Sequence, residues 1–246
     1  MTPAPPALRL AWWGTAWLRG QVVTDLMLDA VIDEDATHTI AGLATLGLTD
    51  SEAAETLVGG LGRLRTEGTS ILGVAWPAVG DAVGLGGPPA FNHAALEAGE
   101  AVVGDAGIGL VPVRVGAVLV WHAYAAQRRQ LPDVGEADRG LRGALVETTH
   151  ALVDLDVARW RPEVADRLMN LRHRVHLAAP PGVPERCVDL AERGLLAAEI
   201  VELALEDDGA ALSAYEMNAR RDALAPLDQA ARRALTAAGS PEVWPP

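Results

Sequence analysis

The sequence contains no lysine, so arginine supplies all 20 of its basic side chains. A Walker-type phosphate loop, a Schiff-base enzyme and a protein kinase each need a lysine at a defined place in the motif. These three kinds of site are therefore excluded. A serine nucleophile elbow is excluded as well, because no Gly-x-Ser-x-Gly pattern occurs and the stretch 68–73 has a different spacing.

Cysteine occurs only once, at Cys187. A single cysteine cannot form an intrachain disulfide or a zinc site built from several thiolates. Arg186 favours the reactive thiolate, but Val188 and Leu190 flank the cysteine and no histidine lies nearby in the sequence. We expect a packed, unreactive thiol at this position.

Positive charge is scarce relative to negative charge. The chain carries 20 basic and 33 acidic residues, which gives a formal net charge of −13. Nucleic acids and anionic membranes both select proteins with a cationic surface. We therefore expect neither nucleic acid nor membrane as a partner.

Long apolar runs are also missing. The longest, 115–126, is interrupted by His122 and is too short to span a bilayer. The apolar stretch 8–18 has no cationic segment before it and so lacks the pattern of a signal peptide. These features predict a cytoplasmic protein.

The pattern typical of β-structure is confined to residues 69–124. Short runs rich in valine, isoleucine and other apolar residues alternate there with glycine and proline, which mark turns. Pro112 cannot donate to a sheet ladder, so its strand should lie at an edge or carry a bulge. We expect a small, mostly antiparallel sheet with strands at 71–76, 101–103, 110–113 and 117–124.

Helical periodicity precedes these strands and predicts helices that flank the sheet. Residues 8–18 form the first, and Thr24 can cap the second. Thr49 and Glu52 have the spacing of a capping box, which predicts that a third helix begins there. The expected fold class is therefore α+β.

Three tryptophans, at positions 12, 13 and 17, lie in the first expected helix. Trp13 and Trp17 are four residues apart and would share a helix face. Tryptophan is common in interaction hot spots, so these residues could form an exposed surface for a partner. We favour their burial as core anchors, because large apolar side chains mostly lie inside.

Beyond a polar linker at 127–135, only helical periodicity remains. Prolines at 162 and 184 mark helix starts, and Pro226 is expected to end one helix before a last one at 228–238. These elements predict a bundle of about five helices. The expected organisation is a mixed region, 1–126, and an all-helical region, 134–239, packed either as one domain or as two.

Residues 77–90 form the longest expected loop, with six glycines and prolines between Gly80 and Pro89. Loops of this length in compact domains are often functional. We expect a mobile lid or docking loop over the sheet. A short helix should follow, with Asn92 as its N-cap and Gly99 just past its end.

The candidate ligand-binding residues lie on this loop and the elements after it. Asp81 and His93 could form a general-base pair, with Asn92 beside them. His122 and Tyr124 have even spacing and would share one face of a neighbouring strand. A cleft under the loop would gather all five side chains. The alternative is a turn at Asp81, a helix cap at Asn92 and surface histidines.

Two further patterns are less specific. His150, Asp154, His173 and His176 could approach each other across a helical hairpin, but the helical wheel directs the histidines to solvent, so we expect no metal and no cofactor. The stretch 104–109 has glycines spaced Gly-x-x-Gly-x-Gly, and a strand rather than a helix follows, which argues for a turn instead of a dinucleotide site.

Two functions remain open from the sequence. The first is a non-catalytic binding or scaffolding protein that acts on a protein partner, because no nucleophile, metal or phosphate motif is present. The second is a small-molecule-binding protein or enzyme with a cleft under residues 77–90. A homo-oligomer is compatible with both.

Overall fold

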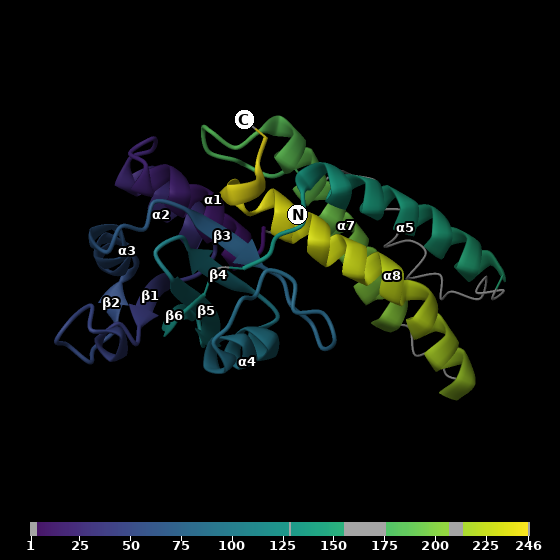
Figure 1. Ribbon diagram of the computed structural model, residues 1–246, viewed down its shortest axis with the longest axis horizontal. Coiled ribbons are helices and arrows are strands. Elements are labelled where there is room, and N and C mark those ends of the chain that lie inside the picture. The colour runs from purple at the N-terminus through teal and green to yellow at the C-terminus, as the bar shows by residue number, and fades with distance from the viewer. Residues whose placement is uncertain (1–3, 128, 155–175, 207–213, 246) are drawn as a thin grey trace.

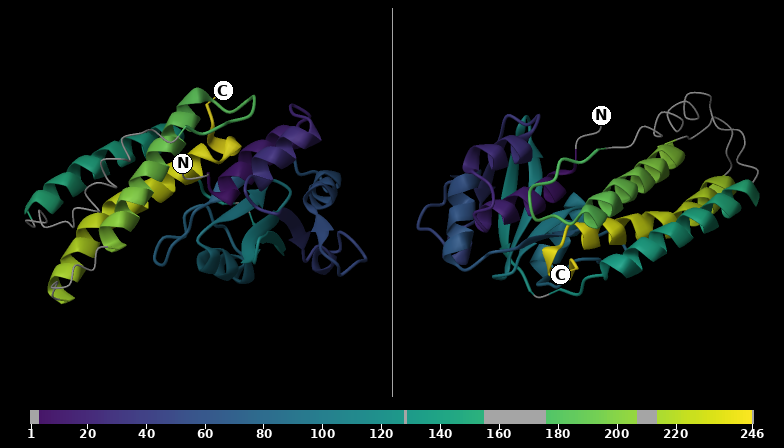
Figure 2. Two further views of the ribbon diagram at one scale, coloured as in Figure 1. Left: turned by 180° about the vertical axis from the view of Figure 1, so that it is seen from behind. Right: turned by 90° about the horizontal axis from the view of Figure 1, so that it is seen from above.

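The computed structural model describes residues 4–127, 129–154, 176–206 and 214–245. These residues form seven α-helices and one six-stranded mixed sheet, which confirms the α+β class (Figure 1). The sheet and its helices occupy the N-terminal half, and three long helices form the C-terminal half. Figure 2 shows the two halves lying side by side, with the long helices extending away from the sheet.

The sheet has the strand order β2-β1-β6-β5-β4-β3. Every neighbouring pair is antiparallel except β1 and β6, which are parallel, so the expected mostly antiparallel sheet is confirmed. The strands are β1 (Thr37–Ala41), β2 (Glu55–Thr56), β3 (Leu72–Ala75), β4 (Ala101–Gly104), β5 (Ile108–Val115) and β6 (Val118–Ala125).

Pro112 lies inside β5, opposite Trp121 of β6. On the other side of β5, the pairing with β4 covers only Leu110 and Gly109. Pro112 therefore lies where β5 has lost one neighbour, and its missing N–H costs no ladder hydrogen bond.

Two strands lie outside the range that the sequence pattern predicted. The prediction that strands are confined to 69–124 is wrong, because β1 and β2 add to the sheet beyond β6. β1 is short, and its identity depends on its parallel register with β6, in which Thr37 lies opposite Val118 and Ile40 opposite Trp121. Pairing with a strand 80 residues away leaves little trace in a five-residue sequence.

The third helix begins later than the capping-box pattern predicted, because β2 pairs with β1 just before it. Thr49 does not begin it; α3 spans Leu57–Thr66, and the Thr56 Oγ1 atom accepts a hydrogen bond from the N–H of Gly59 at 3.1 Å. Thr56 thus ends β2 and caps α3 at once. The Thr49 and Glu52 pattern lies in the loop before it.

One face of the sheet is covered by α1 (Pro6–Leu18), with α2 (Thr24–Ile32) and α3 packed beside it. Trp12 is 2% exposed, and Trp13 and Trp17 are half-buried against the same core. Their indole nitrogens donate to the Ala178 carbonyl oxygen and to Thr24 Oγ1, respectively. The prediction that the tryptophans are core anchors is confirmed.

The C-terminal half contains α5 (Val134–Asp154), α7 (Glu185–Glu206) and α8 (Ala214–Ala238), and α8 packs against both of the others. Pro226 does not end a helix, so that prediction is wrong; α8 continues through it. The buried side chains of Leu224 and Leu227 hold the helix on both sides of the proline. The helix expected after Pro162 lies outside the described residues.

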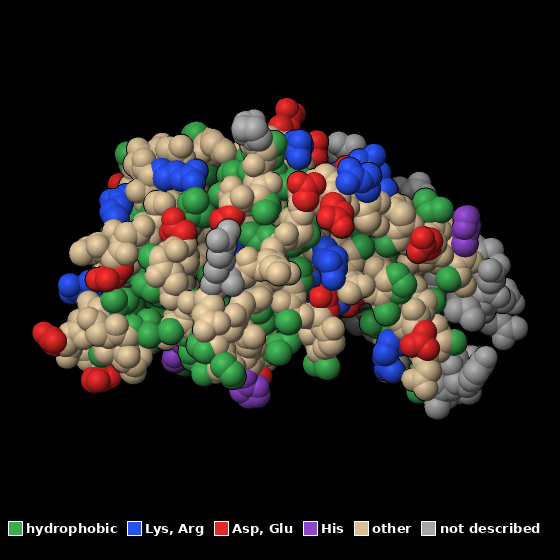
Figure 3. All heavy atoms as spheres, viewed as in Figure 1, with side chains coloured by type: hydrophobic (Ala, Val, Ile, Leu, Met, Phe, Trp, Pro, Cys, Tyr) green, Lys and Arg blue, Asp and Glu red, His purple; other side chains and the backbone are tan. Residues whose placement is uncertain are grey.

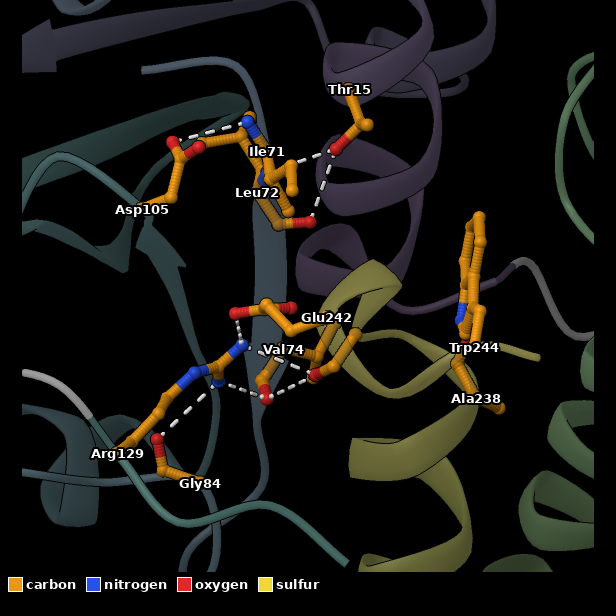
Figure 4. Close-up of polar contacts among 11 residues, drawn as sticks. Thr15, Ile71, Leu72, Val74, Gly84, Asp105, Arg129, Ala238, Glu242 and Trp244 are labelled. Carbon is orange, nitrogen blue, oxygen red and sulfur yellow. Dashed lines mark hydrogen bonds and ion pairs between the residues drawn. The ribbon is translucent and has the colours of Figure 1, made fainter. Parts of the chain in front are cut away.

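Arg129 ties the two halves together at their junction (Figure 4). Its Nη1 atom donates to the carbonyl oxygens of Val74 on β3 and Gly84 on the loop, and Nη2 donates to Ser240 Oγ and Glu242 Oε1. The side chain is 4% exposed. A Cβ atom on Gly73 would overlap Nη2, so glycine is required at that position for this contact.

Candidate ligand-binding groove

A groove of about 910 Å³ lies between the loop 77–90 and helices α5 and α8. We call it the α5–α8 groove. Figure 3 shows the surface indented here, with acidic and basic side chains close together where the loop meets α8. Small and apolar side chains are mixed with polar and charged ones in its lining, which consists of Asp81, Ala82, Val83, Leu85, Gly86, Gln130, Leu131, Pro132, Glu136, Ala137, Gly140, Gly143, Ala144, Glu147, Pro226, Gln229, Ala230 and Arg233.

The α5 wall of the groove is open because of two glycines. Gly140 and Gly143 lie inside the helix, where each costs about 1 kcal/mol relative to alanine. Among the described residues, a Cβ atom at either position would meet no atom within 4 Å. Close packing against another described residue is therefore not the reason that glycine occupies these two positions. The effect of the missing side chains is to leave room beside the helix.

The loop wall is held by hydrogen bonds and ion pairs. Ala78 and Asp81 exchange two backbone hydrogen bonds around a tight turn, and Gly80 has the positive φ of 85° that the turn needs. The Asp81 carboxylate lies 3.7 Å from Arg232 Nη2 and 3.8 Å from Arg233 Nη2, both on α8. The loop thus lies against α8 and the edge strand β3, where Gly84 passes close to Ala75.

The charges around the groove fall into two groups. Asp81 faces Arg232 and Arg233, and Arg232 also pairs with Asp228. Glu136 and Glu147, on α5, are exposed, and within the described part of the chain their carboxylates have no hydrogen bond or ion pair. Unmatched negative charge therefore lies along the α5 side.

Asp81 is the only one of the five predicted site residues in the lining of this groove. Asn92 is not an N-cap, which corrects that prediction: α4 spans Pro89–Ala98 and Pro88 precedes it. The Asn92 Oδ1 atom instead accepts from the Gly87 N–H at 2.9 Å, which fixes the end of the loop. Gly99 does lie just past the helix end, as expected, and has the left-handed conformation.

His93, His122 and Tyr124 are not in the lining of the groove. His93 is exposed on α4 and lies 3.4 Å from Glu97. His122 and Tyr124 point to one face of β6, and the Tyr124 ring packs beside Phe91 at 6.2 Å. No hydrogen bond or ion pair among the described residues joins Asp81 to any of the three.

The α5 residues that line the groove were not predicted as site residues, although their spacing carries a signal. Glu136, Gly140, Gly143 and Glu147 recur at steps of four, three and four within a helical pattern. Glycines on one face of a predicted helix indicate a close approach or an open space at that face.

A buried polar cluster that sequence reasoning missed lies under α1. The Trp121 Nε1–H donates to His38 Nδ1 at 3.3 Å, so His38 Nε2 carries the proton and donates to Asp35 Oδ2 at 2.9 Å. Burial lowers the pKa of His38, outweighing the effect of Asp35. Both ring nitrogens are occupied, so the imidazole cannot act as a general base.

Glu100 and Cys187 also have shifted pKa values. Burial raises the pKa of Glu100 to about 7, although the Ala7 N–H, Arg9 and Arg114 favour its charged form. Burial raises the pKa of the Cys187 thiol to about 11, against a smaller effect of Arg186. The expected packing of this cysteine is confirmed, and its raised pKa disfavours the reactive thiolate.

The structure describes two of the three histidines that were considered as possible metal ligands. His150 is exposed on α5, and His176 lies 3.5 Å from Glu192, while His173 is outside the described residues. Within the ranges the structure describes, no group of three histidine, cysteine or carboxylate side chains is placed to hold a metal. Over the same ranges, no helix has the length and apolar character required to cross a bilayer.

Comparisons with family patterns and with individual known proteins lead to the same group of relatives. The pattern of the Rv1486c-like protein N-terminal domain matches residues 7–135, and that of the C-terminal domain matches residues 135–236. Two relatives from Mycobacterium tuberculosis, "Uncharacterized protein Rv1486c" of strain H37Rv and "Uncharacterized protein MT1533" of strain CDC 1551, are each 31% identical over 232 residues. The alignment covers 76% of this chain and 78% of each relative. No solved structure matches the chain significantly.

Proposed function

The chain belongs to the Rv1486c-like protein family, and we propose that it is a non-catalytic binding protein that holds a small organic ligand in the α5–α8 groove. The observation that carries this proposal is the pair of helical glycines, Gly140 and Gly143, which line the groove and have no atom of the described residues within 4 Å of an added Cβ. A groove of about 910 Å³ has the size of a small-molecule site, and such sites combine an apolar lining with a few polar groups.

The polar groups nearby support binding rather than catalysis. Asp81 is engaged by two arginines, and His93, which was predicted to act with it as a general base, lies beside Glu97 and does not line the groove. The Cys187 thiol is buried, with a pKa raised to about 11. None of these groups has the free, activated form that a nucleophile or general base requires.

An exposed face with Trp12 or Trp17 would have favoured the first function left open by the sequence, a binding or scaffolding protein that acts on a protein partner. Trp12 is buried, and Trp13 and Trp17 use their indole N–H groups in hydrogen bonds within the chain. This arrangement leaves the groove as the better candidate for recognition.

The test compares two leucine substitutions in a thermal-shift screen against a library of small metabolites. Gly143→Leu fills the groove, and Gly62→Leu on α3 is its control, because that glycine is also helical with no atom within 4 Å of an added Cβ. We expect ligands that raise the Tm of the unsubstituted protein and of Gly62→Leu but not of Gly143→Leu. If every ligand found acts equally on all three proteins, the groove is not the binding site.

A further inference from the structure

The face of the sheet opposite α1, α2 and α3 is only partly covered. At one end α4 packs on it: the Phe91 ring lies beside Tyr124, and a Cβ atom on Gly109 would overlap that ring. Near the turn that joins β5 to β6, the described helices leave this face open, because Val113 and Val115 are 44% and 60% exposed. The hairpin of β5 and β6 therefore presents one bare face to solvent.

Valine occupies the positions on this face where polar side chains are usual. In the register of the hairpin, Val113 lies opposite Val120. Val115 lies opposite Val118 on the same face, since alternate residues of a strand point to the same side. An antiparallel sheet with one solvated face normally has polar residues there. We call this surface, which β1 extends, the valine face; it consists of Thr37, Thr39, Val113, Val115, Val118 and Val120.

The valine face carries no charged side chain from the four strands around it. These strands, β1, β2, β5 and β6, contain two charged residues, Glu55 and Arg114. Arg114 lies opposite the buried Leu119, on the covered face, and pairs with Asp35. Glu55 lies opposite the buried Ile40, on the same covered face. The surface is therefore neutral in a chain whose formal net charge is −13.

We propose that the valine face is the contact surface of a homodimer, in which a second copy of this chain packs against it across a two-fold axis. Two copies of an acidic chain repel each other, and the repulsion is weakest where the meeting surfaces are neutral. A two-fold contact needs a patch that fits itself, as a flat face of valine and threonine does. A cationic partner would instead be drawn to the carboxylates elsewhere on the surface.

The size of the face sets the expected strength of the dimer. Four strands about 4.8 Å apart, each about six residues of 3.3 Å in length, give roughly 400 Å² per copy. This is about half of the area that each partner of a stable complex buries, so the dimer should be weak and depend on protein concentration.

Packing of the two faces is favoured over pairing of sheet edges. The free edge of β5 beyond β4 is short, and it contains Pro112, which has no N–H to donate to a new strand. The valine face shares no residue with the α5–α8 groove, so the dimer and the ligand site can be tested separately.

The test is sedimentation equilibrium of the full chain from about 5 µM to about 500 µM, the range in which a weak complex forms. We expect the average mass to rise from 25.8 kDa towards twice that value. Added salt should strengthen the dimer, because it screens the repulsion between two acidic copies and removes no ion pair from the contact. A contact made by ion pairs would respond in the opposite direction.

Two valines of nearly equal exposure provide a matched pair of variants. Val115 is 60% exposed on the valine face, and Val146 is 57% exposed on α5, outside both this face and the groove lining. Val115→Glu should weaken the dimer at least about tenfold, because both copies bring a carboxylate to one contact, whereas Val146→Glu should change it less than about twofold. Val115→Thr keeps the β-branched shape and should weaken the dimer about threefold without disturbing the strand.

A chain that stays at 25.8 kDa across the whole concentration range overturns the proposal. A dimer that Val115→Glu and Val146→Glu weaken equally, or that neither weakens, also overturns it, because the copies would then meet elsewhere or respond only to overall charge. Dissociation of the dimer by added salt would have the same meaning, since it would show a contact held by ion pairs.

Discussion

The indole N–H of Trp12, on the first helix, donates a hydrogen bond to the carbonyl oxygen of Ala238, at the end of the last helix, over 3.1 Å. The Trp244 indole donates to the same oxygen at 2.9 Å. One carbonyl group thus joins two tryptophans that are 232 positions apart. The contact fixes the C-terminal end of α8 against α1 and closes the chain on itself.

Trp12→Phe tests this contact. The substitution keeps most of the buried apolar surface but removes the N–H group, and Trp244 still bonds the carbonyl. We expect a loss of about 1 kcal/mol in the free energy of unfolding in urea. Trp12→Ala should cost about 3–5 kcal/mol, because it also leaves a cavity. A smaller effect for Trp12→Ala than for Trp12→Phe would contradict this account.

Gly73→Ala tests the Arg129 contacts at the junction. The added methyl group would overlap the Arg129 guanidinium, which donates to Val74, Ser240 and Glu242, so we expect a loss of about 1–3 kcal/mol on urea unfolding. Gly62→Ala is the control; it meets open space in α3 and should stabilise the protein by about 0.5–1 kcal/mol. Two substitutions of the same chemistry should thus have opposite signs.

Glu100 makes stability depend on pH. Its pKa is raised from 4.5 to about 7, so between these values the native state holds a proton that the unfolded state has released. Stability must therefore fall as pH rises through this window, and the loss is complete above about pH 7. Glu100→Gln cannot titrate, so its stability relative to the unsubstituted protein should rise by roughly 1–3 kcal/mol between pH 4.5 and 7.5.

The pKa of His38 is lowered, so this residue makes stability rise with pH in the range just below its ordinary pKa of 6.5. His38 is present in both proteins, so its contribution cancels in the difference between them. The measurement is urea unfolding of both proteins at a series of pH values. A constant difference between them across the window would show that the Glu100 pKa is not raised in the folded protein.

Hydrogen exchange tests whether the loop 77–90 is a lid. The N–H of Gly87 donates to Asn92, and its carbonyl oxygen accepts from Gln127, whereas Val79 at the tip is 99% exposed. We expect fast exchange at the tip and slower exchange at Gly87. Asn92→Ala should speed exchange at Gly87 about fivefold, the equivalent of about 1 kcal/mol. Uniform protection across the loop would exclude a lid.

Local patterns predicted much of the fold. The helix expected at 8–18 is present as α1, which begins at Pro6, the central strands lie within one or two residues of their expected places, and Gly99 follows the last residue of α4. These elements carry their signals in neighbouring residues, as apolar periodicity and glycine or proline at turns. The errors, at β1, at the start of α3 and at Pro226, occur where a distant partner outweighed a local preference.

The sequence by itself determined the α+β class and the helical C-terminal half. It also excluded the classes of chemistry that lysine or several cysteines would have supplied. Composition and short-range spacing suffice for these, because each depends on residues present or absent within a few turns. Only the tertiary structure decided that Asp81 faces arginines of α8 instead of His93, and that the glycines of α5 open on a groove beside the loop. Those relationships join residues more than 50 positions apart, and packing of the whole chain sets which of them meet.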